Sequence, residues 1–223
     1  MKQIKAIIFD LDNTLIDFMS FKWKATNAAV TAMIKAGLNV DKKKVMRIVK
    51  ELYDRHGIEY QKVFDDLLKQ TIGHVDQRIL AAGVVAYKRV KGDMLQTYPN
   101  AVPVLKKLKK RVPSIGVVSD APKFQAWTRL FEMKLDKYFD FVLTPEDTKA
   151  FKPSGLPFKK VIEVLKVKPH EVLAIGDWMS RDVLPAKKLG MKTVLARYGN
   201  TTHEPGKADY EIDNIKELLK IVK

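Results

Sequence analysis

The most informative stretch of this 223-residue chain is Phe9-Asp10-Leu11-Asp12-Asn13-Thr14-Leu15, in which two carboxylates and a hydroxyl follow a short apolar run. Residues 5–9 are apolar and β-branched enough to form a strand buried on both faces of a parallel sheet. Asp10 and Asp12 point to the same side while the backbone stays extended. The stretch therefore predicts a carboxylate pair in one pocket beyond a strand end, although Asp, Asn and Thr also end strands by forming local turns.

Composition indicates a soluble globular protein of one or two domains, since 46% of the residues are hydrophobic and 30% are charged. No apolar run approaches the ~18 residues that a membrane-spanning helix needs. The first five residues carry no cleavage signal. The absence of cysteine excludes disulfides, zinc-thiolate sites and cysteine nucleophiles. We therefore expect a cytoplasmic protein that does not bind membranes.

The chain carries 41 Lys and Arg against 26 Asp and Glu, a formal net charge of +15 that attracts anions over a long range. Its one dense basic run, residues 106–111, ends an amphipathic helix, where cations complement the helix dipole. No aromatic residues that could stack on bases are interleaved with this run. The sequence favours a solvated helix end and does not favour nucleic acid as a partner.

Residues 16–96 are expected to form an all-α insert. Apolar residues recur at helical spacing in 22–36, 43–53, 60–72 and 77–91. Gly lies near each break between these segments, and Asp41 is a suitable N-cap for the second of them. The chain therefore leaves the first strand directly for a helical lobe.

From residue 97 onward helices alternate with short apolar strands, which is typical of a parallel sheet. The expected strands are 115–119, 141–144, 172–176 and 193–196, with 210–212 as a candidate edge strand. The expected helices are 101–111, 123–133, 156–166, 181–189 and 214–221. The sequence thus predicts an α/β core formed by 1–15 and 97–223, with 16–96 as a separate domain.

Right-handed crossovers place the C-terminal ends of all these strands on one side of the sheet. Polar residues that could act there follow three of the strands: Asp10, Asp12 and Thr14; Ser119 and Asp120; Asp177 and Asp182. The segment Phe151-Lys152-Pro153 opens the helix before the strand at 172–176. Four such positions in this order are hard to explain as coincidence, so we expect them to meet in one site.

The four segments FDLDNTL (9–15), VVSD (117–120), FKPS (151–154) and GDWMSRD (176–182) together resemble the four motifs of the haloacid dehalogenase-like (HAD) hydrolase superfamily. The resemblance covers essentially the whole chain. It implies a Rossmann-like, doubly wound parallel sheet with an all-α cap domain inserted between the first two motifs, the subfamily I arrangement. It also implies a Mg²⁺-dependent phosphatase for a small phosphorylated metabolite, such as a sugar phosphate, phosphoglycolate or a triose phosphate.

The resemblance implies specific roles for the acidic residues and the lysine. Asp10 would be the nucleophile that forms an aspartyl-phosphate and would also ligate Mg²⁺. Asp12 would be the general acid and then the base, with its backbone carbonyl on the metal. Lys152 would neutralise charge on Asp10 and on the phosphoryl group. Asp177 and Asp182 would complete the Mg²⁺ shell, Asp182 directly or through water.

Further roles follow from the same resemblance. The phosphate-binding site would be lined by Thr14, Ser119, Asp120 and Lys152. Within it, Thr14 would position Asp12, and Ser119 would hold phosphoryl oxygens. Asp120 departs from the commonest pattern beside the phosphate site, and a local turn is the preferred interpretation of it. Trp178 is also unusual and either contacts substrate or packs. Substrate specificity is expected in the cap, with candidates whose alternative is helix packing: Phe18, Phe21 and Trp23.

Three other functions remain open at this stage. Dehalogenation has no need of a second acid, so the presence of Asp12 favours phosphoryl transfer. A phosphomutase would keep both Asp10 and Asp12. A basic module that binds nucleic acid or an acidic protein on the same scaffold is the alternative from another class. The sequence is compatible with a monomer or a homodimer.

Overall fold

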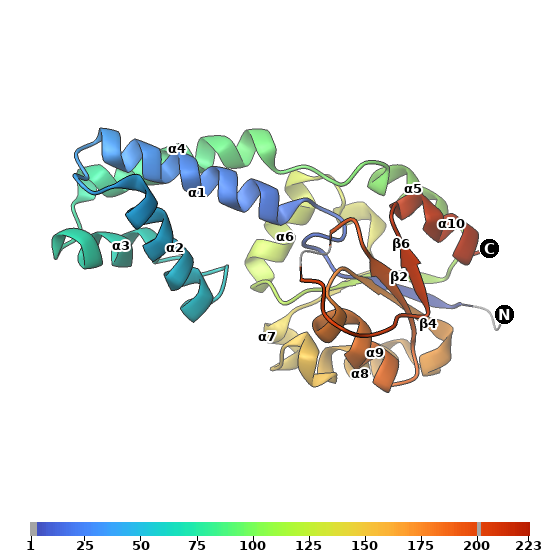
Figure 1. Ribbon diagram of the computed structural model, residues 1–223. Helices are drawn as coiled ribbons and strands as arrows, with labels where there is room; N and C mark the ends of the chain where they lie inside the picture. The colour runs from blue at the N-terminus through green and yellow to red at the C-terminus, as the bar shows by residue number, and fades with distance from the viewer. Residues whose placement is uncertain (1–3, 200–201) are drawn as a thin grey trace. The chain divides into compact units, whose positions relative to one another are not determined.

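The computed structural model describes residues 4–199 and 202–223 and falls into two compact units (Figure 1). The α/β unit comprises Met1–Asp17 and Gln96–Lys223, and the helical unit comprises Phe18–Leu95. These limits lie close to the predicted domain boundaries after residues 15 and 96. Residues 1–3, on which part of the prediction of no leader segment rests, lie outside the described ranges.

The α/β unit is built on a six-stranded parallel sheet in the order β3-β2-β1-β4-β5-β6. The strands are β1 (Ala6–Phe9), β2 (Ser114–Val118), β3 (Phe141–Leu143), β4 (Val172–Gly176), β5 (Lys192–Ala196) and β6 (Tyr210–Ile212). Phe9 of β1 lies opposite Val117 of β2 and Ile175 of β4. The three central strands therefore end at the same level, and the residues that follow them meet at one edge.

Helices cover both faces of this sheet (Figure 1). They are α5 (Ala101–Leu108), α6 (Lys123–Glu132), α7 (Pro145–Thr148), α8 (Leu156–Leu165), α9 (Leu184–Lys188) and α10 (Leu218–Ile221). Ala6 and Ile8 of β1 belong to a core cluster with Phe158 and Val161 of α8 and Ala186 of α9. Helices α5 and α10 lie on the opposite face. All four residues of β1 are buried, so the predicted two-faced burial and the predicted α/β fold class are confirmed.

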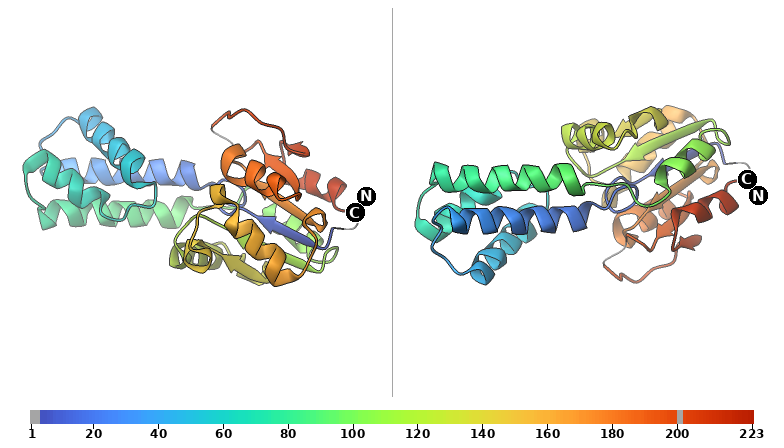
Figure 2. Two further views of the ribbon diagram at one scale, coloured as in Figure 1. Left: turned by 90° about the horizontal axis from the view of Figure 1, so that it is seen from below. Right: turned by 90° about the horizontal axis from the view of Figure 1, so that it is seen from above.

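The helical unit contains α1 (Phe18–Lys35), α2 (Lys42–His56), α3 (Val63–Ile72) and α4 (Gln77–Met94). Helices α1 and α4 run antiparallel, side by side (Figure 2). The unit has its own apolar core, which includes Met33, Val49 and Leu67. The predicted N-cap of α2 is confirmed, since the Asp41 side chain accepts a hydrogen bond from the Lys44 N–H at 3.0 Å.

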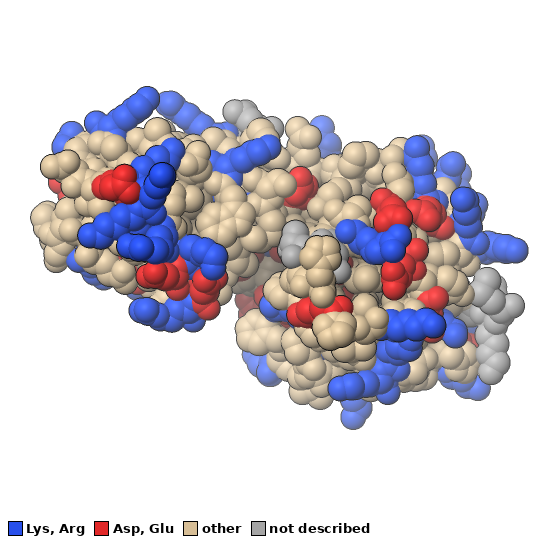
Figure 3. Space-filling view, in the orientation of Figure 1, with Lys and Arg blue, Asp and Glu red and all other residues tan. Residues whose placement is uncertain are grey.

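Charged side chains of both signs are interspersed over each unit in the view of Figure 3. The large positive charge is therefore spread over that face rather than concentrated on one element. Among the helices of the described ranges, none combines the length and the apolar character that crossing a membrane requires.

Candidate active site

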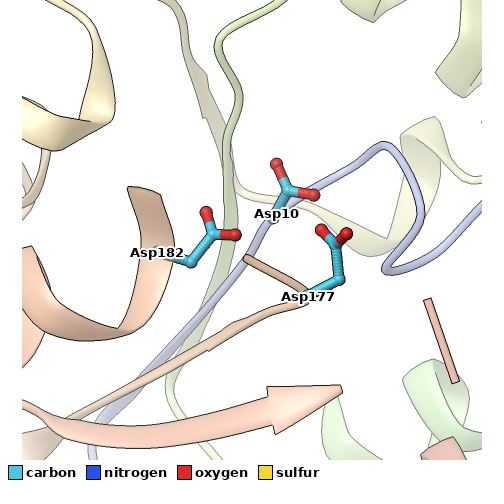
Figure 4. A group of neighbouring side chains, drawn as sticks. All are labelled: Asp10, Asp177 and Asp182. Atoms are coloured by element: carbon cyan, nitrogen blue, oxygen red, sulfur yellow. The ribbon is translucent and has the colours of Figure 1, made fainter. Parts of the chain in front are cut away.

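Three buried carboxylates meet where β1 and β4 end. Asp10 directly follows β1, Asp177 directly follows β4, and Asp182 comes from the helical turn after it. Figure 4 shows the three side chains pointing toward one another, and each offers an oxygen that lies within 4.8 Å of the others. The three residues converge as predicted, because the register of the central strands brings the strand ends to the same level.

Asp182 reaches the strand ends because the chain folds back tightly after β4. Residues Met179–Val183 form a π-helical turn, in which the Asp182 N–H donates to the Trp178 carbonyl at 2.8 Å. In return, Asp182 Oδ2 accepts the Trp178 N–H at 2.9 Å. A Cβ on Gly176 would overlap the Asp182 side chain, so only glycine at the end of β4 leaves room for it.

Lys152 is the buried cation of this cluster. Its Nζ lies 2.5 Å from Asp10 Oδ1 and 2.5 Å from Asp182 Oδ1. Burial disfavours the ammonium, but Asp10, Asp182 and Asp120 together outweigh that effect and raise the pKa of Lys152. Lys152 therefore carries its charge at any physiological pH and links the nucleophile predicted at Asp10 to Asp182.

The cluster holds more negative charge than Lys152 can balance. Burial, with the neighbouring carboxylates, raises the pKa of Asp10 to about 7 although Lys152 opposes the shift. Burial and the charges of Asp10 and Asp182 raise the pKa of Asp177 to about 9. When ionised, three carboxylates and one ammonium leave two uncompensated charges. An all-oxygen donor set with that charge fits a hard divalent cation such as Mg²⁺.

The Asp12 carboxylate does not belong to this group of three. Asp12 lies in a tight turn that Asn13 allows with φ 60°, and its Oδ2 lies 2.5 Å from Nη1 of Arg129 in α6. The metal contact predicted for Asp12 is through its backbone carbonyl, and it stays a prediction. Sequence reasoning missed Arg129. The available signal was an arginine at the spacing of the buried residues of α6, Ala126 and Leu130.

The structure places the predicted phosphate-binding residues beside these carboxylates. Ser119 is buried at the end of β2, and its Oγ accepts the Ala121 N–H at 3.1 Å, which leaves the hydroxyl proton to be donated. The Thr14 hydroxyl lies 3.5 Å from Asp177 Oδ1. That contact is with Asp177 rather than with Asp12, the residue that Thr14 was expected to position.

The local-turn interpretation of Asp120 is wrong. Asp120 Oδ1 accepts the Lys152 backbone N–H at 2.8 Å. Its Oδ2 accepts Nε of Arg181 at 3.1 Å and Nη2 at 2.5 Å. Both partners are distant in sequence, and the Arg181 guanidinium neutralises the carboxylate. Asp120 therefore fixes the backbone of Lys152 instead of forming a local turn.

The aromatic residues proposed for specificity have packing partners. The Trp178 indole donates to Glu204 Oε1 at 2.7 Å, and the Arg181 guanidinium lies 4.9 Å from its ring. Within the helical unit, Phe18 and Phe21 are buried and their rings are 5.8 Å apart, while other edge contacts join Phe21 to Tyr87 and Trp23 to Tyr53. These contacts are those of the packing alternative, and a specificity role stays a prediction.

Similarity to known proteins gives the class of this enzyme. The sequence profile of haloacid dehalogenase-like hydrolases matches residues 4–190, and the chain belongs to this family. Glyceraldehyde 3-phosphate phosphatase of Methanocaldococcus jannaschii is 36% identical over 222 residues, covering 99% of this chain and 97% of the relative. The enzyme of the same name from Pyrococcus furiosus is 32% identical over 226 residues, covering 100% of this chain and 94% of the relative.

A solved structure supports the same family. The HAD phosphatase of Thermococcus onnurineus is 29% identical, covers 97% of each chain and superposes with a TM-score of 0.72. The predicted family and enzyme class are therefore confirmed. Hydrolases of this family generally use Mg²⁺, and the acidic group formed by Asp10, Asp177 and Asp182 could hold a metal ion.

Proposed function

We propose that the protein is a Mg²⁺-dependent phosphatase that forms an aspartyl-phosphate on Asp10, and that a triose phosphate is its substrate. The observation that carries the proposal is the Lys152 ammonium, 2.5 Å from both Asp10 and Asp182 inside a buried group of three carboxylates. With a divalent cation added, Lys152 and the metal would balance the charges of both the nucleophile and a dianionic phosphoryl group.

Asp10 acts as the nucleophile in its ionised form, which burial disfavours and the Lys152 charge favours. A Mg²⁺ ion held by Asp10, Asp177 and Asp182 would neutralise these carboxylates and polarise a phosphoryl oxygen. An oxygen of Asp10 bonds to phosphorus while the ester P–O bond breaks. Lys152 and the Ser119 hydroxyl hold the phosphoryl oxygens during this transfer.

Asp12 moves the protons of both half-reactions. It gives its proton to the leaving alcohol oxygen in the first, which leaves a neutral alcohol and the aspartyl-phosphate on Asp10. It takes a proton from water in the second, and the resulting hydroxide attacks phosphorus. The P–O bond to Asp10 breaks, inorganic phosphate leaves, and the Asp10 carboxylate is regenerated.

The experiment measures release of inorganic phosphate from an alkyl phosphate with MgCl₂, for the parent chain and for Asp10→Asn. We expect kcat to fall by at least about 10³-fold in Asp10→Asn. The matched control is Asp213→Asn, an acid-to-amide change at an exposed side chain that should leave kcat unchanged. Activity that survives in Asp10→Asn, or in excess chelator, contradicts the mechanism.

The proposed substrate class is supported by the relatives from Methanocaldococcus jannaschii and Pyrococcus furiosus, which are named glyceraldehyde 3-phosphate phosphatase. We expect kcat/KM for glyceraldehyde 3-phosphate to exceed that for phosphoglycolate, glucose 6-phosphate and pyrophosphate. A preference of more than about tenfold for any of these competitors would overturn the triose phosphate assignment and leave the phosphatase mechanism intact.

A further inference from the structure

Arg129 is an arginine buried in the apolar side of α6. Its side chain is 5% exposed, and the other buried residues of the helix are Ala126 and Leu130. Taking a guanidinium out of water is unfavourable unless a partner compensates its charge. The compensation comes from Asp12, whose Oδ2 lies 2.5 Å from Nη1 although the two residues are 117 positions apart in the chain.

We propose that Arg129 is a positioning residue for Asp12, an inference that rests on the proposed function. The backbone of the Asp12 turn is held by hydrogen bonds such as Asn13 N–H to the Ile16 carbonyl at 2.7 Å. Those bonds act on the backbone and do not by themselves orient the carboxylate. The ion pair with Arg129 fixes the orientation of the carboxylate.

The contact with Arg129 involves one carboxylate oxygen of Asp12, Oδ2. A guanidinium only donates hydrogen bonds, so this contact holds Oδ2 and with it the plane of the carboxylate. A misdirected proton donor loses rate even when the nucleophile is intact, because a displacement of about 1 Å can cost about 10²-fold.

The test compares esters that differ in their need for a proton. An alkyl phosphate expels an alkoxide that must be protonated, whereas 2,4-dinitrophenyl phosphate expels a stable phenolate that need not be. We expect Arg129→Met to lower kcat/KM for the alkyl ester by about 10²-fold and for the aryl ester by less than about threefold. Arg129→Lys should recover part of the loss, since it restores a cation without the planar fork.

Two controls separate this inference from simpler explanations. Arg197→Met removes an exposed arginine that pairs with Asp213. It should leave kcat/KM unchanged for both esters. The double variant Asp12→Asn/Arg129→Met should resemble Asp12→Asn alone, because Arg129 acts through Asp12. Equal losses on both esters in Arg129→Met, or no loss, overturn the inference, the first result indicating phosphate binding or a general structural role.

The same experiment distinguishes failure of the inference from failure of the proposed function. If Asp12→Asn does not lower kcat/KM for the alkyl ester more than for the aryl ester, the acid role of Asp12 is wrong. If Asp12→Asn shows that selectivity and Arg129→Met does not, the mechanism stands and the positioning role is wrong.

Discussion

Addition of Mg²⁺ to the metal-free protein is predicted to stabilise it strongly at pH 8 and weakly at pH 5. The pKa values of Asp10 and Asp177 are raised from the ordinary 3.8 to about 7 and about 9. A carboxyl whose pKa is raised by folding binds more protons in the folded state than in the unfolded state, so the metal-free protein loses stability as pH rises from about 4 to 9. Below that window the protons already neutralise the site and compete with the metal.

The size of the effect follows from mass action. At a Mg²⁺ concentration of about 100 times Kd, binding to the folded state alone adds about 2.7 kcal/mol to the free energy of unfolding. For a chain of this length each kcal/mol raises Tm by about 2–4 °C, so we expect a rise of about 5–11 °C at pH 8. At pH 5 protonation of the raised carboxyls reduces the rise to less than about 2 °C.

The assay is scanning calorimetry in chelator and in MgCl₂, with NaCl added to equalise ionic strength. Asp177→Asn removes one ligand and also the destabilisation that comes with the raised pKa of Asp177. It should therefore raise Tm in chelator at pH 8 and lose most of the response to Mg²⁺. Asp213→Asn, at an exposed side chain, should keep the full response. The reasoning is refuted by equal responses at pH 5 and pH 8, or by a full response in Asp177→Asn.

Three further substitutions test the contacts around the site. Asp120→Ala removes the acceptor of the Lys152 N–H, which lies 2.8 Å away. We expect kcat to fall about tenfold and the free energy of unfolding to fall by about 1–3 kcal/mol. An unchanged kcat would show that this contact does not position Lys152 for catalysis. Gly176→Ala places a methyl group on the Asp182 side chain, so calorimetry should show a loss of about 1–3 kcal/mol and a smaller response to Mg²⁺. Tyr198→Phe deletes a 2.9 Å hydrogen bond to a carbonyl of the turn after β1 and should cost about 1–3 kcal/mol in denaturant titration, whereas a neutral result would indicate that water replaces the hydroxyl.

The strands could be predicted because each is a short apolar run between polar ends, and burial on both faces leaves a parallel strand few polar residues. The helix limits were less accurate. The first helix was expected from residue 22, but α1 begins at Phe18, where the buried side chains Phe18 and Phe21 continue the apolar stripe. The third was expected from residue 60, but α3 begins at Val63.

The convergence of Asp10, Asp177 and Asp182 could also be predicted, since all three follow strand ends of one parallel sheet. The arginine partners of Asp12 and Asp120 could not be predicted from the sequence. Arg129 and Arg181 are two of many basic residues in the chain, and which arginine meets which carboxylate depends on how α6 and the π-helical turn pack. A single sequence contains periodicity and local spacing, which determine elements and their ends, but not the pairing of long side chains across them.

The distribution of cations around the site indicates which carboxylate lacks one. Four of the acidic residues at the strand ends form ion pairs with lysine or arginine: Asp10, Asp12, Asp120 and Asp182. Within residues 4–199 and 202–223, no ion pair serves Asp177, whose side chain has a distant contact with the Thr14 hydroxyl at 3.5 Å. The pKa of Asp177 is also raised further than that of Asp10, to about 9 against about 7. The charge that the fold leaves uncompensated is therefore at Asp177, and a divalent cation shared with Asp10 and Asp182 would supply it.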